Sequence, residues 1–204
     1  MPTDNFEVQI KRVLQEHPGL SYNDQSKMFS GILIIDEGDQ YNITIDLTPF
    51  PQKFPIVIET NERIRPIADN HINYDGSCCF TVPVKEQILL KKGLIKTISQ
   101  FINKIVVPFF QNNSFREING NYKNGEYSHG LSGIIEAYSD ILGVNDLELT
   151  VKILIRYLKG NGYGKNDPCF CGSNKKFKDC HSYRFKDLSL IDKSIIMADL
   201  KRIF

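Results

Sequence analysis

The chain has 204 residues, with 25 Lys and Arg against 24 Asp and Glu, and its net charge is +1. A balance this close to neutral gives no general argument for nucleic acid or for an acidic partner. The N-terminus lacks the basic-then-apolar pattern of a signal peptide, and the longest apolar runs are too short to cross a bilayer. We therefore expect a protein that is neither secreted nor inserted in a membrane.

Five cysteines fall into two clusters, at 78–79 and at 169–180. Free or metal-bound thiols fit a reducing compartment better than a secreted disulfide scaffold does. The cysteine usage therefore predicts a cytoplasmic protein.

The first quarter of the chain predicts a helix followed by an antiparallel meander. Residues 4–17 carry apolar side chains at helical spacing before a Pro-Gly pair. Apolar and polar residues alternate over 28–35 and 41–47, which indicates a hairpin, and 56–59 is a third predicted strand. This order predicts an α+β domain with an antiparallel sheet.

A long loop is predicted over 61–84, because little in it is periodic. Loops of this length are usually functional or disordered, and its aromatic and proline content argues against disorder. A helix is predicted over 94–107, with Pro108 ending or kinking it. The segment 112–124 is polar and rich in turn formers, so it is predicted to be irregular.

The C-terminal half predicts helices at 132–142 and 146–158 and an amphipathic last helix over 187–204. A glycine-rich stretch separates the first two of these helices from the second cysteine cluster, and the last helix follows that cluster. We expect three parts: a main domain over 1–158, a linker over 159–164 and a small module over 165–204.

The second cluster has the composition of a zinc site. Cys169, Cys171, Cys180 and His181 supply three thiolates and one imidazole, which is a full tetrahedral set with no position left for water or substrate. We therefore expect structural zinc, because so small a module has too little core to fold without metal. The segment 166–181 resembles the SEC-C motif, a compact zinc-binding tail found at the end of a bacterial protein-export motor and on many unrelated bacterial proteins. The lysines around it form either a solvated face or a surface for an acidic partner.

The first cluster lies in the long loop, in the segment His71-Ile72-Asn73-Tyr74-Asp75-Gly76-Ser77-Cys78-Cys79. A cysteine thiol can act as a covalent nucleophile, and an Asn side chain can stabilise the oxyanion that forms when a thiol attacks a carbonyl. The alternative is structural, because cysteine is often buried as a small apolar residue.

The first 110 residues resemble ubiquitin-conjugating enzymes. The similarity covers the helix, the meander and the proline-rich segment 49–55. It also covers the loop, where that family has His-Pro-Asn, a glycine and then the catalytic cysteine. Counting from Gly76, the resemblance assigns the catalytic thiol to Cys79. It implies a UBC-like fold with the sheet followed by helices.

The resemblance also implies roles for the loop residues. Cys79 would accept an acyl group as a thioester from the C-terminal tail of a donor protein, delivered by a separate activating enzyme, and pass it to a lysine. Asn73 would stabilise the oxyanion or order the loop, and His71 would hold the loop by hydrogen bonding. Cys78 is left as a packing residue or a second thiol, and Asp75 is a candidate proton acceptor.

Three departures from the family indicate a divergent bacterial branch. Ile72 replaces the family's proline, the spacing from Asn73 to Cys79 is short, and the chain contains no tryptophan. Members of that branch belong to anti-phage defence systems built around a cyclic-oligonucleotide synthase. The implied donor is that synthase or a ubiquitin-like protein.

Two other functions stay open at this point. A conjugating-enzyme fold can be a non-catalytic adaptor that binds a protein tail. A thiol protease that cleaves such conjugates would need a histidine base beside Cys79, for which His71 and His129 are candidates.

Overall fold

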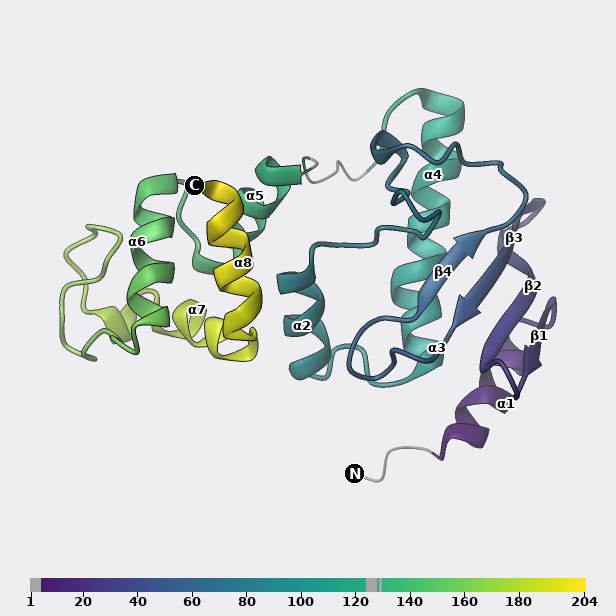
Figure 1. Ribbon diagram of the computed structural model, residues 1–204, viewed down its shortest axis with the longest axis horizontal. Coiled ribbons are helices and arrows are strands. Elements are labelled where there is room, and N and C mark those ends of the chain that lie inside the picture. Colours follow the sequence, from purple (N-terminus) through teal and green to yellow (C-terminus); the bar gives the residue numbers. More distant parts are fainter. Residues whose placement is uncertain (1–4, 124–127, 129) are drawn as a thin grey trace. The chain divides into compact units, whose positions relative to one another are not determined.

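The computed structural model describes residues 5–123, 128 and 130–204. It divides into two compact units (Figure 1). The first comprises Met1–Thr81 and Lys92–Glu126, and the second comprises Val82–Lys91 and Tyr127–Phe204. This division does not follow the expected boundary at 158, because the helices after residue 130 pack with the C-terminal helices.

The first unit contains a four-stranded antiparallel sheet with the strand order β1-β2-β3-β4. Helix α1 (Phe6–Glu16) precedes strands β1 (Leu20–Asn23), β2 (Met28–Asp36), β3 (Asp39–Asp46) and β4 (Ile56–Glu59). The predicted α+β class and antiparallel meander are confirmed. Strand β1 was not predicted, because four residues carry too little alternation to stand out.

A glycine allows β1 to join the sheet. Gly31 pairs with Leu20 across the two strands and has a φ of +134°. A Cβ at this position would lie 2.3 Å from the carbonyl oxygen of Gly19. Any other side chain would therefore be both strained and blocked by backbone.

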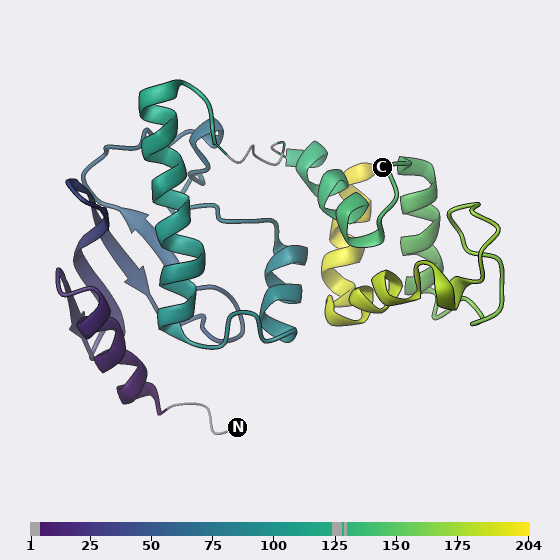
Figure 2. The same cartoon turned by 180° about the vertical axis from the view of Figure 1, so that it is seen from behind.

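A long helical segment packs against the sheet, as both views show (Figures 1 and 2). Helix α3 (Ile98–Phe101) continues through a π-helical turn (Ile102–Val106) into α4 (Val107–Asn119). Pro108 does not end the helix, and the segment 112–124, which was predicted to be irregular, is helical as far as Asn119. Proline cannot donate to the carbonyl one turn earlier, and the π-turn directly before α4 accommodates that loss.

The core of the first unit lies between the sheet and this segment. Tyr41 of β3 stacks on Phe110 of α4 with ring centroids 4.4 Å apart, and its hydroxyl is 2.8 Å from Ser114 Oγ. The other large residues that are fully buried here are Phe29, Leu33, Ile43, Ile45, Ile98, Phe101 and Ile102. The sheet and α4 together form the support on which the loop after β4 rests.

The second unit is helical in its described residues. It contains α2 (Pro83–Lys91), α5 (Gly130–Leu142), α6 (Leu147–Leu158), α7 (Ser182–Asp187) and α8 (Lys193–Ile203). The helices predicted at 132–142 and 146–158 are confirmed. Helix α2 was not predicted, and the predicted last helix is interrupted, because a 3-10 turn at Leu188–Leu190 precedes α8.

Both polar contacts and apolar packing join these helices. Asp192, just before α8, accepts hydrogen bonds from Gln87 Nε2 at 2.7 Å and Lys91 Nζ at 2.8 Å of α2. In the core, the Tyr138 hydroxyl of α5 donates to Asp199 of α8 at 3.0 Å. None of the described helices combines the length and apolar character that crossing a bilayer requires.

Candidate functional site

The thiol loop, residues 71–79, is attached to strand β4. Isolated bridges pair Ile58 with Ser77 and Ile72 with Cys78. The Cys78 N–H donates to the carbonyl oxygen of Val57 at 2.8 Å. The loop is therefore fixed at its cysteine end by the same kind of bonds that hold the sheet.

Backbone contacts bring two of the predicted site residues together. The Cys79 N–H donates to the His71 carbonyl oxygen at 2.7 Å. His71 itself has a φ of +55°, and its ring centroid lies 5.4 Å from that of Tyr122. His71 thus closes the loop through its backbone carbonyl, and the holding role expected for it stays a prediction.

The Asn73 side chain acts within the loop. Its Nδ2 donates to Ser77 Oγ at 3.0 Å, and the Ser77 hydroxyl donates to Asp75 Oδ1 at 2.6 Å. Hydrogen bonds from Ser77 lower the pKa of the Asp75 carboxyl, which makes Asp75 a weaker base. Sequence reasoning missed Ser77, although an Asp-Gly-Ser turn often makes such bonds. This network favours loop ordering, the second of the two roles considered for Asn73.

The two adjacent cysteines have different surroundings. Cys78 is 7% exposed, and burial raises the pKa of its thiol to about 12. Cys79 is half-buried, and burial raises its pKa as well. Cys78 therefore has the environment of a packing residue, whereas Cys79 reaches the surface as a largely protonated thiol.

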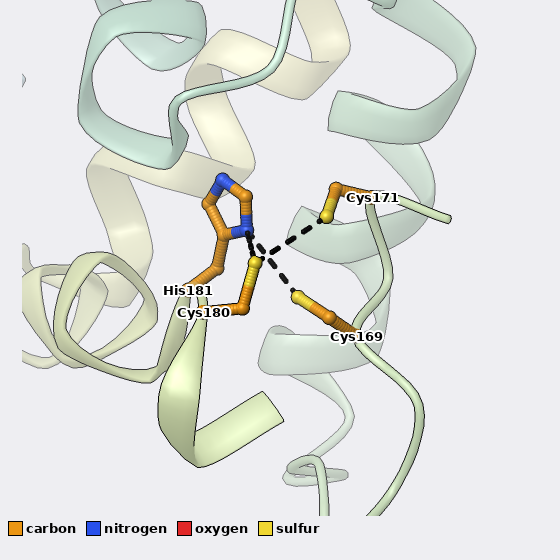
Figure 3. A group of neighbouring side chains, drawn as sticks. All are labelled: Cys169, Cys171, Cys180 and His181. Atoms are coloured by element: carbon orange, nitrogen blue, oxygen red, sulfur yellow. Dashed lines mark hydrogen bonds between the residues drawn. The ribbon is translucent and has the colours of Figure 1, made fainter. Parts of the chain in front are cut away.

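In the second unit the four predicted metal ligands converge (Figure 3). Their ligand atoms all lie within 4.8 Å of one another. His181 Nδ1 is 3.3 Å from Cys169 Sγ and 3.1 Å from Cys180 Sγ, and Cys180 Sγ is 3.6 Å from Cys171 Sγ. Zinc–sulfur bonds of about 2.3 Å in a tetrahedron put two sulfurs about 3.8 Å apart. The donor set and its spacing therefore fit zinc.

A serine that the sequence reasoning missed lies beside two of these sulfurs. Ser173 Oγ is 3.2 Å from Cys171 Sγ and 3.5 Å from Cys180 Sγ. Its hydrogen bond is the main cause that, together with hydrogen bonds from Cys180 and Cys169, lowers the pKa of Cys171 to about 6, towards the thiolate that a metal requires. The sequence signal that could have predicted this contact is the position of Ser173, two residues after the ligand Cys171.

Backbone geometry holds the ligand loops in place. A bridge pairs Pro168 with Lys176, and the Cys169 N–H donates to the Lys175 carbonyl oxygen at 2.9 Å. Gly172 turns the chain with a φ of +74°, and its N–H donates to the Cys169 carbonyl oxygen at 3.1 Å. This turn lets two cysteines that are only two residues apart face the same point.

Aromatic rings pack beside the cluster. Tyr163 lies with its ring centroid 5.3 Å from Phe170, 5.2 Å from Phe177 and 5.4 Å from Phe185. Phe170 in turn lies 5.0 Å from the His181 ring. The motif therefore has a small apolar core of its own, built around Tyr163.

Comparison with known proteins agrees with this geometry. The family model of the SEC-C motif matches residues 166–182. This segment is a SEC-C motif. Protein translocase subunit SecA of Ruthia magnifica subsp. Calyptogena magnifica is 49% identical over 43 residues, which are 21% of this chain but 5% of SecA. The chain thus spans a small fraction of that relative, and the identity says nothing about the rest of either protein.

No solved structure matches the chain significantly. The SEC-C match lies wholly in the second unit. The resemblance of the first 110 residues to ubiquitin-conjugating enzymes stays a prediction.

Proposed function

We propose that the first unit is a UBC-like acyl carrier that forms a thioester at Cys79. The observation that supports this most is the order of its elements: a helix, an antiparallel meander and then a loop, fixed to β4, that carries His71, Asn73 and Cys79. This is the order that the resemblance to ubiquitin-conjugating enzymes implies.

The proposed chemistry has two steps. The Cys79 sulfur attacks the thioester that joins the donor's C-terminal carbonyl to an activating enzyme; the new S–C bond forms as the old one breaks, and the Cys79 proton goes to the departing thiol. A lysine amine then attacks the Cys79 thioester, an amide forms, and the thiol is regenerated with a proton from the amine. The donor has to arrive activated, because a free carboxylate offers no leaving group that a thiol can displace.

The proposed setting follows from the resemblance. The donor would be a protein with a reactive C-terminal tail, such as a cyclic-oligonucleotide synthase or a ubiquitin-like protein, and the system would be a bacterial anti-phage defence in the cytoplasm. Zinc in the SEC-C motif would be structural, because all four ligand positions come from the chain.

The test uses the two cysteines as a matched pair. The protein and its genomic neighbours are co-expressed, and its intact mass is measured with and without a thiol reductant. We expect an adduct that reductant removes, that is absent in Cys79→Ala and that persists in Cys78→Ala. An adduct that survives in Cys79→Ala would contradict the proposal.

A second candidate is an adaptor that binds a protein tail without chemistry. The raised pKa of Cys79 favours it, because burial disfavours the thiolate, which is the nucleophilic form. In that case the donor would co-purify with the chain without covalent attachment, and Cys79→Ala would bind it equally well.

The protease alternative needs an imidazole base at Cys79. The described ring contact of His71 is with Tyr122, and His129 lies outside the described residues. No observation here favours this alternative over the other two.

A further inference from the structure

The first unit has a recess of about 280 Å³ between the loop after β4 and the C-terminal half of α4. Three arginines from these two segments line it. The residues that determine its chemistry are Arg63, Arg65, Asn70, Asn113, Arg116 and Glu117. Neither the thiol loop nor the SEC-C motif contributes any of them.

Arg63 forms a fixed wall of the recess. Its Nη1 is 2.6 Å from Asp39 Oδ1, and its Nη2 is 2.7 Å from Glu117 Oε2. Its guanidinium lies over the Tyr41 ring, 4.2 Å from the centroid. Two carboxylates therefore hold Arg63 and take up its charge, and three arginines against two carboxylates still leave the recess with a net positive charge.

Arg116 is half-buried and lacks an anionic partner. Its Nη1 donates to Asn70 Oδ1, and its guanidinium lies 4.9 Å from the centroid of Tyr122. No carboxylate within the described part of the chain forms an ion pair with it. The Nε and Nη2 groups of Arg116 have no protein acceptor among the residues that the structure describes. A partly buried guanidinium is stable only when water or an anion accepts hydrogen bonds from such groups.

Arg65 supplies the second unpaired charge. Its side chain is exposed, and in the described residues it has neither a hydrogen bond nor an ion pair. The two amides of the recess are already engaged, because Asn70 Nδ2 donates to the Arg65 carbonyl oxygen and Asn113 Nδ2 donates to that of Phe109. Recognition in the recess therefore depends on charge and on guanidinium N–H donors.

We propose that this recess binds the phosphate group of a small molecule, with Arg116 and Arg65 as the donors. Two separate guanidinium groups offer more N–H donors than one carboxylate can accept, whereas a phosphate monoester has three terminal oxygens and nearly two negative charges. The recess is at the lower end of ligand-site volumes, which begin at about 300 Å³. It therefore fits a phosphate with one small organic group, and not a large nucleotide.

The test is isothermal titration calorimetry of the full chain with inorganic phosphate, with glycerol 3-phosphate and with acetate as a carboxylate. We expect saturable binding of the two phosphates at one site and weaker binding of acetate. Arg65→Gln and Arg116→Lys should each weaken phosphate binding about tenfold or more, since each removes charge-assisted hydrogen bonds. Lys53→Gln is the matched control, because it removes one exposed positive charge of the same unit outside the recess.

Absence of saturable phosphate binding up to about 10 mM would overturn the proposal. So would phosphate binding that Arg65→Gln leaves unchanged, because Arg65 is exposed and its replacement does not disturb the fold. If acetate bound as tightly as phosphate, the proposal would also be overturned, because the recess would then be a carboxylate site. Arg116→Lys is compared only after its thermal unfolding has been shown to match that of the unmodified protein.

Discussion

The adjacent cysteines should differ widely in reactivity towards alkylating agents. With a pKa of about 12, Cys78 is ionised in about one molecule in ten thousand at pH 8, against about a quarter for an unperturbed thiol. A thiolate of higher pKa is a better nucleophile, which recovers about fortyfold of this difference. The net expectation is that Cys78 reacts roughly fiftyfold more slowly than a free thiol, before its burial slows it further.

The assay is iodoacetamide labelling at pH 8, followed by peptide mass spectrometry. Cys78→Ala reports on Cys79 alone, and Cys79→Ala reports on Cys78 alone. Cys79 should react faster than Cys78, because it is half-buried while Cys78 is 7% exposed. In urea the two rates should become equal. Equal rates in the folded protein would refute the reasoning about their burial.

Four further predictions concern stability and metal. Cys180→Ser should lower the zinc content well below one ion per chain and destabilise the SEC-C motif, which metal analysis and thermal unfolding would detect; full zinc retention would contradict the ligand set. Tyr138→Phe should cost about 1–3 kcal/mol in urea unfolding, because it leaves the Asp199 carboxyl without its donor. Burial raises the pKa of Asp199, so the folded state binds its proton more tightly, and its contribution to stability should fall as pH rises through that pKa; Asp199→Asn should remove this slope. Gly31→Ala should cost about 2 kcal/mol or more, whereas a near-neutral unfolding midpoint would contradict the close approach to Gly19.

The elements that sequence reasoning predicted correctly are those set by local pattern. The hairpin of β2 and β3 has a clear two-residue alternation, and the metal ligands are specified by residue type and spacing alone. For this reason the α+β class and the Cys/His cluster could be predicted from the sequence.

The elements that it missed depend on tertiary contacts. Helix α2 has nine residues and little amphipathic character, so its sequence pattern does not indicate a helix. It is held by contacts such as the hydrogen bond from Gln87 to Asp192, which the sequence alone does not reveal. Pro108 was predicted to end or kink the helix, but the π-turn before it lets α4 continue. The recess around Arg116 was missed because its residues are about fifty positions apart in the chain.

The sequence indicated which residues share the thiol loop, but not how they are arranged in it. His71, Asn73 and Cys79 do share one loop, but the bond from Asn73 to Ser77 and the different burial of the two cysteines depend on how the loop packs on β4. Residue types can nominate a nucleophile, whereas its protonation depends on burial that only the fold determines.

The most direct test of the central claim is to map the attachment site of any adduct formed on the protein in cells that also contain its genomic neighbours. Tandem mass spectrometry under acidic, reductant-free conditions would preserve a thioester. The account predicts that the C-terminal carbonyl of a partner protein is joined to the sulfur of Cys79. A partner that is only non-covalently bound, or one attached to a residue other than Cys79 when lysine acceptors are blocked, would contradict it.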